Sequence, residues 1–237
     1  MLEVDRINSF YGDSHVLFDV SMKVRAHEVV ALLGRNGAGK TTTLKTIAGV
    51  IRPRSGTIHF AGEPIHRLAS HAIARLGLQL VPEERRIFAT LTAEENLRLA
   101  ALTVPDPWPV ERIFDTFPRL AERRRARGGH LSGGEQQMLA IARALIRSPK
   151  LILLDEPFEG LAPVIVEDLL SLCQRLAEAG PTIVIVEQNV RAALSLAQRV
   201  YILNNGHNVF EGTPRSLHDN PEVMSRYIGV GAEEEAI

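Results

Sequence analysis

The sequence predicts an α/β fold built on a parallel sheet. Apolar, strand-like runs alternate with helix-like segments over much of the 237-residue chain, and this alternation favours parallel strands covered by helices. A glycine-rich turn, GRNGAGKT, joins one of these strands to one of these helices. A third observation is that the middle of the chain, at about 84–148, reads as helical and separates strand-rich segments on either side.

The expected strands lie, in chain order, at about 2–8, 16–24, 28–33, 56–60, 77–81, 151–155, 182–187 and 199–203, and the expected helices at about 40–48, 133–147, 164–178 and 190–197. In the helical middle, Thr92 followed by Glu95 matches a capping box, and the prolines of VPDPWP interrupt the helical pattern. We expect one domain over 1–230, with a helical subdomain at about 84–148 inserted in its core, and an acidic flexible tail at 231–237.

The composition is that of an ordinary soluble globular protein, with 45% hydrophobic and 23% charged residues. The formal net charge of −1 gives no general attraction to a nucleic-acid backbone. Cys173 is the single cysteine, so an internal disulfide is excluded, and its apolar neighbours predict a place in the core. No apolar run approaches the ~20 residues of a spanning helix, and the N-terminus has no secretory pattern. Any membrane role would therefore come through a partner.

The glycine-rich turn has the spacing of a phosphate-binding loop, G-x-x-x-x-G-K-T. Its glycines let successive backbone N–H groups curl around an anion, and the helix that follows adds the positive end of its dipole. Lys40 supplies charge to the β- and γ-phosphates, the Thr41 hydroxyl is placed for Mg²⁺, and Thr42 for a phosphate contact. The residues expected to bind the nucleotide here are Gly34, Arg35, Asn36, Gly37, Ala38, Gly39, Lys40, Thr41 and Thr42.

A second apolar strand, KLILLDEP, ends in two carboxylates. In nucleoside triphosphatases an acid at a strand end can hold Mg²⁺, while the neighbouring acid orients or deprotonates the attacking water. We therefore expect Asp155 to complete the metal site and Glu156 to act as the base.

A second helix start suited to an anion lies between these motifs, in HLSGGEQQMLAIARAL. Ser132 is a good N-cap, and Gly133 and Gly134 leave the first-turn N–H groups open. One nucleotide rarely needs two such starts from one chain. Either this is an unusually capped helix, or it closes over a nucleotide held by a second subunit.

With these motifs the chain resembles the ATP-binding cassette family, whose signature is carried here by Leu131, Ser132, Gly133, Gly134 and Glu135. The resemblance extends from about 2 to 229, with the motifs in family order. It implies a P-loop NTPase with a RecA-like core, an antiparallel β subdomain and a helical subdomain, in which two cassettes enclose two ATP molecules with Mg²⁺. It also places Tyr11 against adenine, although an isolated tyrosine can simply pack.

A narrower resemblance, to the ATPase subunits of branched-chain amino-acid importers, is carried by LVPEERRIFATLTAEENL, RGGHLSGGEQQMLAIARAL, DEPFEGLAP and IVIVEQN. Glu83 stands where most cassettes have a glutamine, and its carboxylate could still approach Mg²⁺. Gln188 replaces the usual switch histidine, while Glu159 and Ala162 replace a frequent serine and aspartate. These departures bear on the rate of hydrolysis and leave the ATP-binding residues intact.

The resemblance implies an ATPase peripheral to the cytoplasmic face of the membrane, which couples ATP hydrolysis to uptake of branched-chain amino acids or related small polar solutes. The implied partners are a second cassette, transmembrane permease subunits and, indirectly, an external solute-binding protein. Because Gln188 should give the weaker site, we expect a heterodimer, with homodimers possible in isolation. The alternative is a soluble cassette or regulatory nucleotide-binding module acting on nucleic acid or ribosomes, against which the absence of overall basic charge counts.

Overall fold

A computed structural model of the protein describes residues 1–229. Its central element is a six-stranded sheet in the order β10-β9-β3-β8-β7-β6, in which β10 is antiparallel to β9 and the other neighbours run parallel. The strands are β3 (Val29–Leu33), β6 (Leu78–Val81), β7 (Leu151–Asp155), β8 (Thr182–Val186), β9 (Arg199–Asn204) and β10 (His207–Gly212).

The middle strands of this sheet are buried on both faces, which explains their unbroken apolar sequences. Along β7, Ile152 and Leu154 belong to one hydrophobic cluster, whereas Leu151 and Leu153 belong to another on the opposite face. β3 divides its residues between the same two clusters in the same alternating way. The sheet therefore separates two cores.

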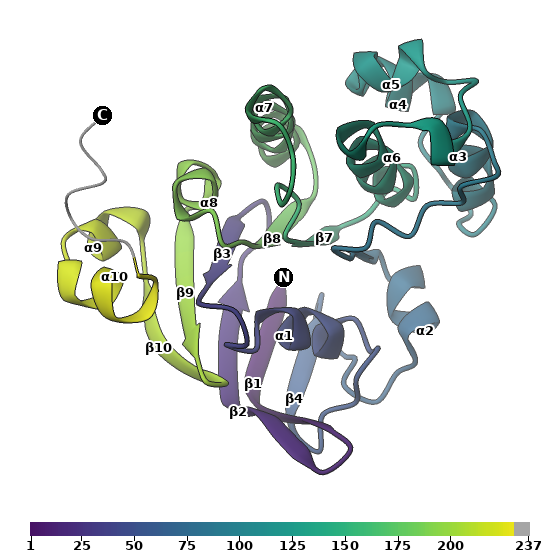
Figure 1. Cartoon of the computed structure of the whole chain (residues 1–237). Helices are drawn as coiled ribbons and strands as arrows, with labels where there is room; N and C mark the ends of the chain where they lie inside the picture. The colour runs from purple at the N-terminus through teal and green to yellow at the C-terminus, as the bar shows by residue number, and fades with distance from the viewer. Residues whose placement is uncertain (230–237) are drawn as a thin grey trace.

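A four-stranded antiparallel sheet, in the order β2-β1-β4-β5, lies beside the central one. Its strands are β1 (Leu2–Tyr11), β2 (Ser14–Val24), β4 (Ser55–Phe60) and β5 (Glu63–Pro64). Helix α1 (Lys40–Ile47) follows β3 and lies between the two sheets (Figure 1), where Leu44 and Ile47 join the core shared by both. The start of α1 is therefore held from two sides.

The middle of the chain forms a group of helices that stands apart from the strands at the upper right of Figure 1. After α2 (Ser70–Arg75) come α3 (Ala93–Ala101), α4 (Val110–Thr116), α5 (Pro118–Glu122), a short 3-10 turn (Gly128–His130) and α6 (Gly133–Leu145). Thr92 and Glu95 form the expected capping box at the start of α3. The prolines fall between α3 and α4, as predicted from their effect on helices.

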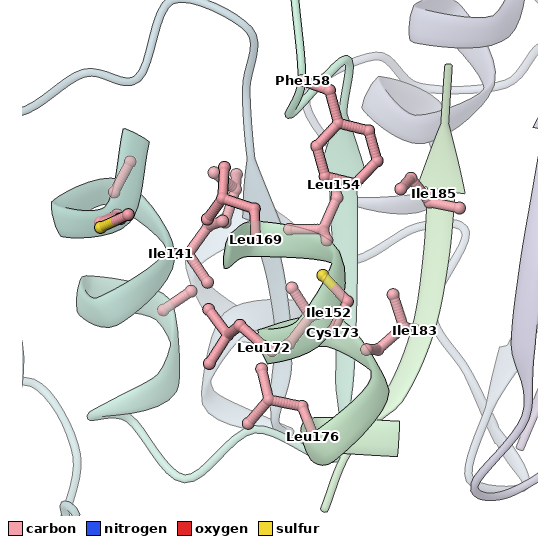
Figure 2. Close-up of a cluster of buried hydrophobic side chains, with 14 of the residues drawn as sticks. Ile141, Ile152, Leu154, Phe158, Leu169, Leu172, Cys173, Leu176, Ile183 and Ile185 are labelled. Carbon is pink, nitrogen blue, oxygen red and sulfur yellow. The ribbon is translucent and has the colours of Figure 1, made fainter. Parts of the chain in front are cut away.

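Helix α7 (Pro163–Ala179) packs between α6 and one face of the central sheet. Figure 2 shows side chains of α7 packed between Ile141 of α6 and strands β7 and β8. Among them Cys173 is 1% exposed, and burial raises the pKa of its thiol to about 12. The predicted core position of this cysteine is confirmed.

The predicted fold class is confirmed, and so are all the strands and helices expected from the sequence, to within a few residues. The sequence did not predict β5, β10 and the short helices α2, α4, α5, α9 (Pro214–His218) and α10 (Pro221–Tyr227), whereas α8 (Val190–Leu196) was expected. The expected acidic tail lies outside the described residues, and the division into subdomains stays a prediction. Within residues 1–229, no helix combines the length and apolarity needed to cross a bilayer.

Candidate functional site

The phosphate-binding loop joins β3 to α1 and requires its glycines for steric reasons. A Cβ on Gly34 would lie 2.3 Å from the backbone oxygen of Leu203, and one on Gly39 would lie 2.7 Å from the Leu17 side chain. Both glycines, and Gly37, also have positive φ angles, which side chains disfavour. The close approach to β9 and β2 therefore fixes the shape of the loop.

Lys40, the first residue of α1, points back into this loop. Its side chain is 5% exposed, and its Nζ donates to the Gly34 carbonyl at 2.8 Å and to that of Arg35 at 3.4 Å. The carboxylate of Glu156 lies 3.6 Å from the same ammonium group. Because the charge is already held inside the loop, a phosphate that enters can exchange with these oxygens at little entropic cost.

A cavity of about 360 Å³ opens beside the loop. It brings together loop residues with side chains that follow β6, β7 and β8 at the carboxyl ends of the strands, where parallel α/β sheets bind ligands. The residues that line it are Val16, Asn36, Gly37, Ala38, Gly39, Lys40, Thr41, Thr42, Glu83, Glu156, Glu159 and Gln188. The phosphate loop, Glu83, Glu156 and Gln188, each predicted from the sequence as part of the site, thus meet in one place.

Asp155 ends β7 directly beneath the first turn of α1. Its Oδ1 accepts a hydrogen bond from the Thr41 hydroxyl at 2.8 Å, and the residue is 1% exposed. Burial raises the pKa of Asp155 to about 6, against the lowering effect of the Thr41 hydrogen bond, and the charge of Glu156 raises it further. A metal cation beside this carboxylate would favour its ionised form.

The oxygens of Thr41 and Asp155 fit Mg²⁺, which is usually held by one or two protein ligands together with substrate phosphates. Residues 1–229 contain no group of three or more His, Cys, Asp or Glu side chains that could hold a metal alone. This donor set therefore suits a metal that arrives with, and is shared by, a nucleotide. Glu83 lines the same cavity, and its approach to the metal stays a prediction.

Glu156 and Gln188 contact each other, although 32 residues separate them in sequence. The Gln188 side-chain amide donates a short hydrogen bond to Glu156 Oε2. Glu156 also has a φ of 48°, a left-handed conformation that costs energy in a non-glycine residue and is common at functional sites. The nearby carboxyl of Glu159 has a raised pKa, caused first by burial and then by the negative charges of Glu156 and Glu83.

Glu187, next to Gln188, is a buried residue of the site that was not predictable from the sequence. It is 2% exposed and accepts hydrogen bonds from the backbone N–H groups of Phe158, Gln188 and Asn189 at 2.9, 3.1 and 3.2 Å. Burial raises its pKa to about 7, although these hydrogen bonds pull in the opposite direction. A charged residue directly after an apolar strand was the only signal in the sequence.

These two raised pKa values predict how stability depends on pH. Because Asp155 and Glu187 have folded-state pKa values of about 6 and about 7, above the ordinary values near 4, the folded state binds more protons than the unfolded state between about pH 4 and pH 7. The free energy of unfolding of the nucleotide-free protein should therefore fall as the pH rises from about 5 to about 7, by on the order of 2 kcal/mol. Urea titrations at a series of pH values, in the presence of EDTA, measure this free energy of unfolding. Glu187→Gln should flatten the fall, and equal slopes in the two proteins would contradict the assignment.

The residues around Ser132 form the start of α6 as predicted. Ser132 Oγ accepts from the Glu135 backbone N–H at 3.3 Å, and the Glu135 carboxylate accepts from the Ser132 N–H at 2.7 Å, which completes a capping box. A Cβ on Gly134 would lie 2.7 Å from Ile165 of α7, so this glycine is also a packing requirement. Arg85 lies over Gly133 and donates to Gln137 at 3.2 Å, a link that the sequence did not suggest.

The chain does not bring this helix start to its own phosphate loop. Within residues 1–229, the lining of the loop cavity includes neither Ser132, Gly133, Gly134 nor Glu135. Tyr11, at the end of β1, does not line it either and is 49% exposed. The helix start at Ser132 and the Tyr11 side chain therefore lie outside the cavity, where a second subunit or another part of a nucleotide could contact them.

Comparison with known proteins agrees with this geometry. The ABC transporter family matches residues 17–159. The chain is 45% identical to the high-affinity branched-chain amino acid transport ATP-binding protein BraG of Pseudomonas aeruginosa over 97% of this chain and all of BraG. It is 38% identical to the lipopolysaccharide export system ATP-binding protein LptB of Escherichia coli K12, over 92% of this chain and 93% of LptB.

A solved structure of similar fold is the dimeric post-hydrolysis state of the ATP-binding cassette MJ0796 bound to ADP and Pi. It superposes with a TM-score of 0.81 at 25% identity, over 91% of this chain and 99% of that one. The phosphate loop, the acidic end of β7 and the capped start of α6 thus occur in a chain that matches a family along most of its length. The chain belongs to the ABC transporter family and is an ATP-hydrolysing, ATP-binding cassette subunit of a transporter.

Proposed function

We propose that the chain drives the uptake of branched-chain amino acids or related small polar solutes through a membrane importer. The observation that carries this proposal is the 45% identity to BraG over 97% of this chain and all of BraG. LptB, which belongs to an export system, is 38% identical, so identity favours the amino-acid relative by a modest margin. The transmembrane subunits would hold the chain at the inner face of the membrane and select the solute.

The proposed roles in hydrolysis follow from the contacts in the cavity. Lys40 and the loop N–H groups would bind the phosphates, while Thr41 and Asp155 would hold Mg²⁺, whose charge would offset the negative charge that develops on the phosphates during transfer. Glu156 takes a proton from the attacking water, and Gln188 orients Glu156 through their hydrogen bond. Gln188 can donate a neutral hydrogen bond to a γ-phosphate but lacks the positive charge available to histidine.

The proposed working unit is a dimer of cassettes, in which each chain completes the other's site. The separation of the Ser132 helix start from the chain's own cavity supports this arrangement, and the related cassette MJ0796 is dimeric in its ADP-bound structure. The weaker electrostatics of Gln188 suggest a second, different cassette that supplies the stronger phosphate site.

Replacement of Lys40 tests phosphate binding. Lys40→Ala removes a charge-assisted contact and should weaken ATP binding by about 2–3 kcal/mol, measured by titration with labelled ATP. Lys23→Ala, on the outer face of β2, is the matched control and should leave affinity unchanged. A folded Lys40→Ala protein with wild-type affinity would refute the role assigned to this lysine.

The surface that we propose for contact with the transmembrane subunits is a groove of about 590 Å³. It lies between the end of β6, the segment 82–88, α3 and α6, and its lining includes the exposed apolar side chains of Phe88 and Leu99. Arg143 and Arg147 line it too, and the Nε atom of each has no hydrogen-bond partner within the described chain. Phe88, 45% exposed, is therefore at the surface rather than in the core.

Loss of this contact should uncouple transport from hydrolysis. Phe88→Ala should lower solute uptake by about tenfold, as expected for a central aromatic contact, while basal ATP turnover of the chain stays within about twofold of wild type. Leu102→Ala, which removes an exposed apolar side chain outside the groove, is the control for a general surface effect. Equal losses of uptake and turnover in a folded Phe88→Ala protein would indicate a local structural role instead.

The transport function itself is tested by co-expression with the transmembrane subunits and second cassette of a branched-chain amino-acid importer, in cells that lack their own. Copurification with the membrane subunits and ATP-dependent uptake of labelled leucine, isoleucine or valine are expected, and Lys40→Ala should abolish uptake. Copurification with nucleic acid or ribosomes, or with lipid-exporting membrane subunits, would contradict the proposal.

A further inference from the structure

Glu187 is the described buried carboxylate that the proposed mechanism leaves without a role. It follows β8, is 2% exposed, and forms none of the ion pairs of residues 1–229. Burial of an unpaired carboxylate is costly, whereas a neutral side chain of similar volume would fill the same space more cheaply. The three hydrogen bonds that the carboxylate accepts are therefore the feature that favours a glutamate at this position.

Those hydrogen bonds join two segments that meet in the catalytic cavity. Oε1 accepts from the Phe158 N–H, in the loop that follows Glu156, and Oε2 accepts from the N–H groups of Gln188 and Asn189. Glu187 thus forms a bridge between these two segments. Phe158 is 4% exposed and packs in the core, which fixes its end of the bridge. One carboxylate thus anchors the backbone on both sides of the hydrogen bond between Gln188 and Glu156.

The chemistry of the group suits this bridge. An ionised carboxylate only accepts hydrogen bonds, with about four lone-pair sites, so it can serve three N–H donors at once. A glutamine of the same shape would turn its NH₂ group toward one or two of these donors and leave them unsatisfied. The other available explanation, that Glu187 merely caps α8, is weakened because the Asn189 side chain already accepts from the Ala192 N–H at 3.1 Å.

We propose that Glu187 is a positioning residue for ATP hydrolysis, which holds the Gln188 side chain on Glu156 by tying the two segments together. The inference rests on the proposed roles of Glu156 and Gln188. In this role Glu187 does not contact ATP. Its replacement should therefore lower turnover and leave nucleotide affinity unchanged. Movement of the loop after β7 would also be transmitted directly to Gln188.

The test is a double-mutant cycle on the full chain without a second cassette, at concentrations where it forms active dimers and every site uses Gln188, in which kcat, KM and ATP affinity are measured. Glu187→Gln and Gln188→Ala should each lower kcat by about tenfold, the effect of one lost hydrogen bond, with ATP affinity within about twofold of wild type. If Glu187 acts through Gln188, the double variant should be no slower than the slower single variant. Asn189→Ala, which removes the cap of α8 but not the bridge, should keep at least about half of the wild-type kcat.

Three outcomes would overturn the proposal. Multiplied losses in the double variant would mean that Glu187 acts independently of Gln188, and an equal kcat loss in Asn189→Ala would assign Glu187 to helix capping. Full turnover in Gln188→Ala would remove the proposed role of Gln188 as well, which distinguishes failure of that role from failure of Glu187 alone. If Glu187→Gln does not fold, Glu187→Asp repeats the comparison with a shorter carboxylate, and failure of both to fold would make Glu187 a residue of the fold only.

Discussion

Glu156→Gln should lower ATP turnover by roughly 10²–10⁴-fold while ATP binding survives. The substituted amide keeps the shape of the side chain and can accept a hydrogen bond, but it cannot take a proton from water. The contact with Lys40, 3.6 Å away, loses its charge in this variant, so the lysine is freer to meet phosphate. We therefore expect a long-lived, ATP-bound dimer, seen by size-exclusion chromatography or analytical ultracentrifugation in the presence of ATP and Mg²⁺.

Glu159→Gln is the matched control, because it removes a carboxylate from the same cavity without removing the proposed base. Its turnover should stay within about tenfold of wild type. Near-normal turnover in Glu156→Gln would show that another group is the base, and Glu83, which lines the cavity, would be the next carboxylate to replace.

Ser132→Arg should cripple the ATP site that borrows this helix start, by about 10²-fold or more in turnover. A long cationic side chain at the N-cap fills the space in front of the first-turn N–H groups and removes the hydroxyl that caps Glu135. The variant is made in a complex of this chain with its partner cassette, and turnover is measured at saturating ATP. Ser132→Ala, which loses the cap but leaves the space open, should cost much less.

Comparing the turnover lost in Gln188→Ala with that lost in Ser132→Arg tests whether the two ATP sites of the dimer are unequal. If the stronger site belongs to the partner's phosphate loop, Gln188→Ala in this chain impairs only the weaker site and should cost far less than Ser132→Arg. Equal damage from the two variants, or full transport driven by this chain without another cassette, would contradict the unequal-site arrangement.

Local chemistry explains which features the sequence could predict. The phosphate loop, the capping box at Thr92 and the N-cap at Ser132 each depend on residues only a few positions apart, so their motifs predict their geometry. The buried strands were predictable because unbroken apolar runs suit a sheet that is covered on both faces. The roles of Thr41 and Asp155 were predicted from their motifs, and their hydrogen bond spans 114 residues.

The features that escaped prediction depend on contacts between distant segments or on elements too short to show a period. Gly134 packs against Ile165 of α7, and Glu187 meets the Phe158 N–H from another strand end. Nothing in the local sequence of either residue specifies its neighbour. Helices such as α2 and α9, of six and five residues, are too short for a hydrophobic pattern to repeat.

Mixing two inactive variants tests whether the helix start at Ser132 acts on a nucleotide held by another chain. Lys40→Ala lacks a working phosphate loop, and Ser132→Arg lacks a working helix start, so each alone should turn over ATP poorly. In an equimolar mixture, at concentrations where the wild-type chain forms active dimers, each mixed dimer contains one intact composite site. We expect recovery to roughly a quarter of wild-type turnover, because random pairing makes about half of the dimers mixed and one of the two sites in each mixed dimer is intact. A mixture no faster than the mean of the two variants would show that both elements act within one chain.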